Sequence, residues 1–189
     1  KISRTKSCRN NKREIPDAKI ISNLKWDSYE TDLIVFIDSH AIIIESKSGK
    51  ITDRALRGAR DRLKRHVEEL LIAPNEQSMR LKKKLLMLAK NPEIEDPIRD
   101  KLPIDLKNLK RIVRISVTLE DFCSIQSNIK QIASTGWLPE SFEPCPTMNL
   151  ADFETLFDLL EHPVQIIHYL ESRQELESSY GYLGSELDL

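Results

Sequence analysis

The 189-residue chain is predicted to be an α/β protein, because strand-like and helix-like segments alternate along it. Two runs rich in β-branched residues, Thr31–Ile37 (TDLIVFI) and Ala41–Lys47 (AIIIESK), are separated by three residues and predict an antiparallel hairpin. Both runs are nearly continuous in apolar residues, which is typical of strands covered on both faces. A further strand-like run follows much later, at Arg111–Leu119.

The other elements follow from periodicity. Lys19–Trp26 predicts a short strand before the hairpin. Apolar residues at spacings of three, four or seven predict helices over residues 53–72, 76–90, about 124–133, 152–161 and 164–176. Pro74-Asn75 is expected to separate the first two helices, and the three prolines of residues 91–110 predict a long loop. Trp26, Tyr29 and Phe36 are expected in the core.

Charge is distributed unevenly along the chain. Residues 1–138 carry 28 basic and 19 acidic side chains, a sum of +9, whereas residues 139–189 carry one basic and 11 acidic side chains, a sum of −10. The net charge of −1 therefore hides a basic part, six of whose positive charges fall in residues 1–13. Three prolines in residues 139–146 mark a boundary. We expect an α/β domain at 1–138 and an acidic helical extension at 139–189.

The sequence contains neither a membrane-spanning run nor a paired-cysteine motif. No apolar run approaches the roughly 18 residues that span a bilayer, so no membrane contact is expected. The three cysteines, Cys8, Cys123 and Cys145, form no CxxC pair and fit a reducing compartment, so a cytoplasmic location is expected. The chain starts at Lys1 without methionine, which suggests a fragment, so the sequence leaves a targeting segment open.

Charged residues gather where the hairpin strands begin and end. Asp32 starts the first strand, and Glu45 and Lys47 end the second on one face of it, because side chains alternate along a strand. An antiparallel hairpin brings the start of one strand beside the end of the next. Two carboxylates and an ammonium therefore converge, and Mg²⁺ binds one or two carboxylates while keeping sites for water and phosphate. The competing interpretation is a salt-bridged strand edge.

The tripeptide alone is not informative. About five Asp/Glu-x-Lys matches are expected by chance in a chain of this composition, and the sequence contains three. Asp17-Ala18-Lys19 precedes the first strand, and Asp105-Leu106-Lys107 lies in the predicted loop. Only Glu45-Ser46-Lys47 ends a buried strand with an acid on the neighbouring strand, so the context singles it out.

The stretch YETDLIVFIDSHAIIIESKSG resembles the PD-(D/E)XK nuclease superfamily, and most closely its nuclease-related domain (NERD) branch. The resemblance covers about residues 18–120 and implies a restriction-endonuclease-like mixed central sheet flanked by helices. It assigns metal and water handling to Asp32, Glu45 and Lys47, and the branch's extra acid to Glu30. A "P-x-x-Q-x-x-R" pattern at residues 74–80 adds Gln77 and Arg80. The N-terminal helix of the family is absent or begins before Lys1.

The resulting hypothesis is a metal-dependent nuclease that hydrolyses DNA with Mg²⁺ or Mn²⁺, as part of a defence or repair system. Asp32 and Glu45 would bind the metal, and Lys47, Gln77 and Glu30 would complete the catalytic site. Backbone contacts to DNA need only basic side chains, and the candidates are Arg54, Arg57, Arg60, Lys64 and Arg80. The alternative is an inactive nuclease-fold module that binds DNA or a partner protein through residues 139–189. Association into a homodimer stays open.

Overall fold

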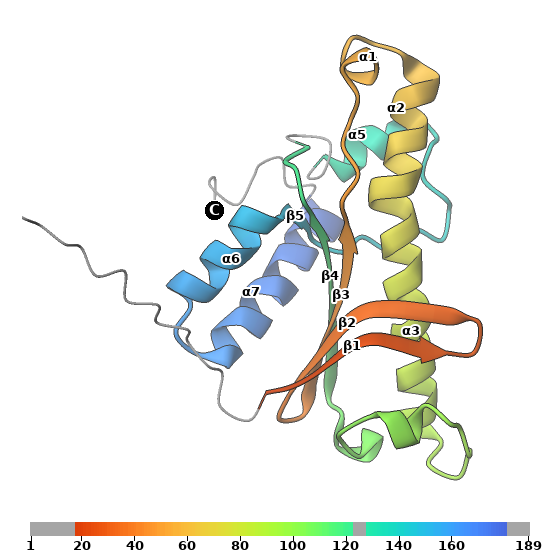
Figure 1. Cartoon of the computed structure of the whole chain (residues 1–189), viewed down its shortest axis with the longest axis vertical. Helices are drawn as coiled ribbons and strands as arrows, with labels where there is room; N and C mark the ends of the chain where they lie inside the picture. The colour runs from red at the N-terminus through yellow and green to blue at the C-terminus, as the bar shows by residue number, and fades with distance from the viewer. Residues whose placement is uncertain (1–17, 123–127, 181–189) are drawn as a thin grey trace, which may run out of the picture.

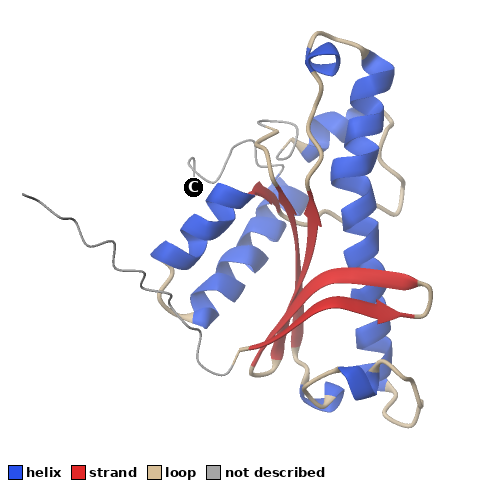
Figure 2. Ribbon diagram, in the orientation of Figure 1, coloured by secondary structure: helices blue, strands red, loops and turns tan. Residues whose placement is uncertain are grey.

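The computed structural model of the chain describes residues 18–122 and 128–180. A five-stranded sheet lies between helices, so the protein is of the mixed α/β class (Figures 1 and 2). The strand order in the sheet is the same as the order along the chain. The strands are β1 (Lys19–Trp26), β2 (Tyr29–Ile37), β3 (His40–Lys47), β4 (Arg111–Thr118) and β5 (Thr147–Asn149).

The first three strands form an antiparallel meander, whereas β4 runs parallel to β3 and β5 parallel to β4. The four strands predicted from the sequence are confirmed. The turn between β2 and β3 is one residue shorter than expected, because Ile37 pairs with His40 and leaves Asp38 and Ser39 to make it. Strand β5 is a correction: the sequence did not predict it, since three residues are too few to show a period.

The connection between β3 and β4 is largely helical. Its first part contains α1 (Asp53–Leu56), α2 (Arg60–Val67), the π-helical turn η1 (Glu68–Ile72) and α3 (Ala73–Lys90). The prediction of one helix over residues 53–72 is wrong, because Gly58, at φ +95°, follows α1 in a left-handed conformation that a helix cannot include.

The predicted break at Pro74-Asn75 is also wrong. Helix α2, η1 and α3 follow one another without interruption, and Pro74 lies in the first turn of α3. A proline inside a regular helix clashes with the carbonyl four residues before it. Here the preceding turn is wider: the backbone N–H of Ala73 bonds to the carbonyl of Glu68, five residues back. The π turn therefore accommodates the proline ring.

The remaining helices are η2 (Arg99–Lys101), η3 (Leu106–Asn108), α5 (Ile129–Ser134), α6 (Leu150–Leu159), α7 (Pro163–Glu175) and η4 (Leu176–Tyr180). The predicted loop at 91–110 thus contains two short 3₁₀ turns. The helix expected over about 124–133 is present from Ile129, and residues 123–127 lie outside the described part of the chain. The two helices predicted near the C-terminus are confirmed, each shifted by one or two residues.

Helices cover both faces of the sheet, as the continuous apolar strands predicted (Figure 2). On one face, Leu81, Leu85 and Leu88 of α3 pack against Ile34 and Ile43. Helices α6 and α7 cover the other face. There Leu156, Ile166 and Leu170 form a second hydrophobic cluster with strand residues such as Ile42 and Ile115. The described part of the predicted extension therefore shares a hydrophobic cluster with strands of the predicted first domain.

The length of the helices and the state of Cys145 also bear on function. Among the described residues, no helix has both the length and the apolar character that crossing a bilayer requires. Cys145 is buried, and burial raises the pKa of its thiol to about 11, so the thiol stays protonated at neutral pH. The basic stretch at 1–13, Cys8 and Cys123 lie outside the described residues.

Candidate metal and nucleic-acid site

Asp32 and Glu45 come together at the end of the β2–β3 ladder. The last pair in the register is Leu33 with Ile44, so Asp32 and Glu45 are the next residues on their strands. The Oδ2 atom of Asp32 accepts hydrogen bonds from the backbone N–H of Ser46 (2.7 Å) and from its hydroxyl (3.0 Å). Both bonds use the same oxygen, which leaves Oδ1 of Asp32 for a ligand.

Glu45 is fully buried, with 0% of its surface exposed. The pKa of its carboxyl is raised from 4.5 to about 8: burial is the largest cause, the negative charge of Asp32 adds to it, and Lys47 opposes both effects. Among the described residues, neither carboxylate oxygen has a hydrogen-bond partner. The Thr31 hydroxyl and the backbone N–H of Asp32 favour the ionised form of Glu45, but neither forms a hydrogen bond of normal geometry with its carboxylate. Such a carboxylate is costly unless it is neutral or meets a cation.

Lys47 ends β3 two residues beyond Glu45, on the same face. Its side chain is half-buried, and its position in the sheet is beside Thr118 of β4. A depression of about 250 Å³ opens at this edge, lined by Lys47 and by Ser46, Ser48, Val117, Thr118, Leu119 and Leu150. This end of the sheet therefore has an open space beside Lys47.

Gln77 reaches the start of the hairpin from α3. Its Nε2 atom donates to the backbone carbonyl of Glu30 over 2.5 Å. The carboxylate of Glu30 is exposed and lies 3.9 Å from the ammonium group of Lys25. The structure thus brings Gln77 to the start of β2, while the side chain of Glu30 contacts Lys25.

Arg80 lies one turn further along α3. Its guanidinium group is 4.9 Å from the ring centre of Tyr29 and 3.8 Å from the carboxylate of Glu76. Tyr29 also contacts Trp26, with ring centres 5.0 Å apart. Trp26 and Phe36 are buried as expected, but the expectation for Tyr29 is wrong, because it starts β2 at the turn and keeps 40% of its surface exposed.

The four other basic candidates lie on α1, on α2 and between them, beyond the end of β3 (Figure 1). All four are exposed. Lys64 lies 3.8 Å from Glu68. Within residues 18–122 and 128–180, Arg54, Arg57 and Arg60 have no acidic side chain within 4.0 Å. These three arginines are therefore the better candidates for phosphate contacts.

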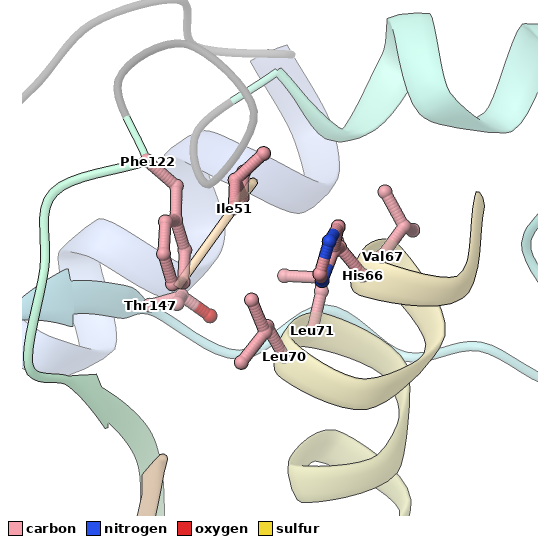
Figure 3. Close-up of a pocket in the computed structure, with 7 residues that line it drawn as sticks. All are labelled: Ile51, His66, Val67, Leu70, Leu71, Phe122 and Thr147. Atoms are coloured by element: carbon pink, nitrogen blue, oxygen red, sulfur yellow. The ribbon is translucent and has the colours of Figure 1, made fainter. Parts of the chain in front are cut away.

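The segment between β3 and α1 is anchored to α2 and η1. Nε2 of His66 lies 3.4 Å from the Thr52 hydroxyl. Figure 3 shows Ile51 and Phe122 facing Leu70 and His66 across a cavity of only about 10 Å³. This packing holds the basic helices at the same end of the sheet as Lys47.

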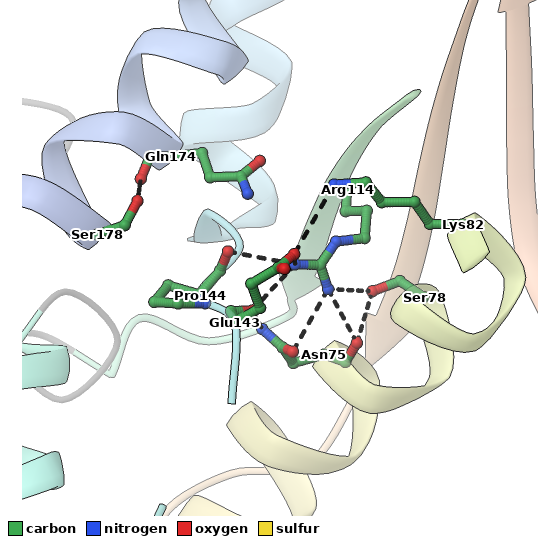
Figure 4. A network of polar contacts seen from close by, with 8 residues as sticks. All are labelled: Asn75, Ser78, Lys82, Arg114, Glu143, Pro144, Gln174 and Ser178. Atoms are coloured by element: carbon green, nitrogen blue, oxygen red, sulfur yellow. Dashed lines mark hydrogen bonds and ion pairs between the residues drawn. The ribbon is translucent and has the colours of Figure 1, made fainter. Parts of the chain in front are cut away.

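A buried polar layer between α3 and the sheet was missed by the sequence reasoning. Arg114 on β4 is fully buried, and Figure 4 shows its guanidinium group surrounded by oxygens. Its partners are the carbonyls of Asn75 (3.1 Å), Glu143 (2.9 Å) and Pro144 (3.3 Å) and the Ser78 hydroxyl (3.4 Å). A signal was available: every second residue from Arg114 to Thr118 is polar, and the residues between and before them, from Ile112 on, are apolar.

The donor set fits a hard divalent cation. Mg²⁺ needs only one or two carboxylates and keeps several waters, and Asp32 and Glu45 supply that number. No cluster of three or more potential ligands (His, Cys, Asp or Glu) is present in the part of the chain that the structure describes. The buried carboxylate of Glu45, without a hydrogen-bond partner, is the feature that a cation would satisfy.

The fold and the site define a mixed α/β protein with two carboxylates and a lysine at one edge of its sheet. Comparisons with protein-family models, with curated proteins and with solved structures give no match for this chain. Membership of the PD-(D/E)XK superfamily and the restriction-endonuclease-like fold therefore stay proposals.

Proposed function

We propose that the chain is a restriction-endonuclease-like nuclease that hydrolyses DNA phosphodiester bonds with Mg²⁺ or Mn²⁺. The observation that carries the proposal is the carboxylate of Glu45, which is fully buried, has no hydrogen-bond partner among the described residues and lies beside Asp32. A structural ion pair would place such a group against a cationic side chain. Among the described residues, no Lys, Arg or His side chain lies within 4.0 Å of the Glu45 carboxylate. Without a cation, the raised pKa keeps Glu45 protonated at neutral pH, and a cation bound between Glu45 and Asp32 would hold both acids in the ionised form.

Each residue has a role that follows from its position. Glu45 and Asp32 Oδ1 would hold the cation. A bound Mg²⁺ lowers the pKa of a coordinated water and offsets charge that builds on the phosphate. Lys47, at the depression, orients the attacking water or stabilises the charge of the transition state. Gln77 fixes the start of β2 through the Glu30 carbonyl, and this contact supports the position of Asp32 two residues later.

The order of elements supports the proposed fold. An antiparallel meander of β1, β2 and β3 is followed by helix α3 and by β4, which is parallel to β3. This order agrees with the core that the NERD resemblance implies. DNA is the preferred polyanion because the exposed basic residues of α1 and α2 lie at the edge where β3 ends.

A cleavage assay on supercoiled plasmid tests the proposal. The wild-type chain is expected to nick the plasmid with Mg²⁺ or Mn²⁺ and not with EDTA, and Lys47→Ala is expected to lose this activity. The matched control is Lys107→Ala, because Lys107 ends another Asp-x-Lys tripeptide but lies on the exposed turn η3. Absence of metal-dependent cleavage by the wild type, or equal cleavage by Lys47→Ala, would contradict the proposal.

A second candidate function is the inactive nuclease-fold module. The observation in its favour is that Asp32 already accepts two hydrogen bonds from Ser46, a purely structural use of that carboxylate. Such a module would bind DNA equally well with and without divalent cations. Calorimetric titration with Mn²⁺ separates the two candidates, since the module is expected to show no binding heat.

A further inference from the structure

Ser116 stands out among the buried hydroxyl groups. The other four buried hydroxyl groups of residues 18–122 and 128–180 all have partners: Thr31 accepts from the Trp26 indole, and Ser78, Thr118 and Thr147 donate to backbone carbonyls. Ser116 is 1% exposed, and its Oγ has no hydrogen-bond partner among the residues that the structure describes. A buried hydroxyl left without a partner costs about 1–3 kcal/mol.

The sheet register places this hydroxyl beside Glu45. Strands β3 and β4 are parallel, and Ser116 is the direct neighbour of Glu45. Neighbouring residues in a ladder project from the same face. That face is the α3 side, because Ile43 of β3 and Ile112 of β4 belong to the hydrophobic cluster with Leu81. Two neighbouring buried polar side chains thus lack partners on one face of the sheet.

Glu45 and Ser116 are not bonded to each other. The ionised carboxylate needs a donor or a cation, whereas the hydroxyl can donate or accept, so a hydrated cation can satisfy both groups. Buried polar atoms of this kind are ordinarily satisfied by ordered water. A hydrated cation at Glu45 brings water molecules with it, because Mg²⁺ and Mn²⁺ sites with few carboxylates keep several waters.

We propose that Ser116 is a positioning residue of the cation site: its Oγ accepts a hydrogen bond from a water molecule of the cation bound at Glu45. The inference rests on the proposed function and adds to it a residue on a third strand. Ser116 would then contact a water molecule that is bound to the metal. Substituting residues that contact the ligands of a metal typically lowers metal affinity by about 10- to 100-fold.

Mn²⁺ affinity measured by calorimetry tests the inference on the full chain. Ser116→Ala is expected to weaken Mn²⁺ binding by about tenfold. The matched control is Ser78→Ala, which removes another fully buried hydroxyl on the α3 side, one that is already bonded to the Asn75 carbonyl. This control is expected to bind Mn²⁺ within about twofold of the wild type.

Thermal unfolding separates a role in metal binding from a role in folding. Without metal, Ser116→Ala is expected to unfold no earlier than the wild type, because it removes a hydroxyl without a partner. With Mn²⁺, the wild type is expected to gain more in Tm than the variant. Unchanged Mn²⁺ affinity in Ser116→Ala, or a loss no larger than that in Ser78→Ala, would overturn the inference alone. Absence of Mn²⁺ binding by the wild type would overturn the proposed function as well.

Discussion

The Oδ2 atom of Asp32 accepts both the backbone N–H and the hydroxyl of Ser46, at 2.7 and 3.0 Å. A side-chain carboxylate therefore takes the place of a backbone carbonyl where β2 and β3 separate. Asp32, which we propose as a metal ligand, therefore also joins β2 to β3 at the open end of the hairpin, next to Glu45. The structural contact with Ser46 and the proposed metal binding thus fall on one residue, and substitutions can separate them.

Asp32→Asn is expected to keep the fold and lose the metal. The amide oxygen of asparagine still accepts from Ser46, whereas a neutral group is a poor ligand for Mg²⁺. Asp32→Ala loses both functions and is expected to lower the free energy of unfolding by about 1 kcal/mol, because the bonds lie at an exposed edge. Urea unfolding and Mn²⁺ calorimetry on the two variants check this. Equal stability of both variants would show that the Ser46 contacts do not stabilise the hairpin.

The raised pKa of Glu45 predicts that the metal-free protein loses stability as the pH rises. The folded-state pKa of about 8 lies above the ordinary value of 4.5, so between these values the unfolded chain releases a proton that the folded protein keeps. Stability is therefore full below the unfolded pKa, falls by up to about 1.4 kcal/mol per pH unit in between, and reaches its lower level above the folded pKa.

Glu45→Gln removes this titration and serves as the comparison. Its free energy of unfolding relative to the wild type, measured in EDTA, is expected to increase from about pH 5 to about pH 8. Denaturant titrations at several pH values measure the difference. A difference that stays constant with pH would mean that the carboxyl of Glu45 ionises normally in the folded protein.

Arg114 is expected to stabilise the contact between α3 and β4. Arg114→Met leaves several buried oxygens of the polar layer without a donor, and the cost is expected to be about 3 kcal/mol of unfolding free energy. Arg111→Met on the same strand is the control, because its ion pair with Glu171, at 2.6 Å, is largely exposed and contributes under about 1 kcal/mol. Similar losses for both variants would argue against a structural role for the buried layer.

We expect DNA binding through the arginines of α1, of α2 and of the segment between them to depend on salt concentration. Replacing Arg54, Arg57 and Arg60 by alanine is expected to weaken binding and to reduce the slope of log affinity against log salt by about 0.9 for each phosphate that is no longer neutralised. The control replaces Lys90, Lys107 and Lys110, which are exposed near the opposite end of α3, with the same change in net charge. Equal slopes for the two triple variants would show that binding is not localised to α1 and α2.

The hairpin and its charged ends could be predicted because the signals are local. Strand alternation placed Glu45 and Lys47 on one face, and the short turn placed Asp32 beside Glu45. The helix over residues 76–90 was predicted from the sequence itself, and the family pattern singled out Gln77; its contact with the Glu30 carbonyl was not predicted. These parts depend on residues within the hairpin or within one motif.

The role that we propose for Ser116 could not be predicted, because it depends on the register between β3 and β4. These strands are about 70 residues apart in the chain, and the intervening helices set how they pair. Strand β5 was too short to show a period. The continuous helix through Pro74 depends on a π turn, and the hydrophobic period does not distinguish a π turn from an α-helical one.

Anomalous diffraction from crystals soaked in Mn²⁺ tests the central claim most directly. The account predicts one anomalous peak at the end of β3, with oxygens of Asp32 and Glu45 both at roughly 2.0–2.2 Å from the ion. It also predicts that the peak disappears in Glu45→Gln crystals soaked in the same way. A Mn²⁺-soaked structure without a peak between these two carboxylates, or with an equal peak in the variant, would contradict the account.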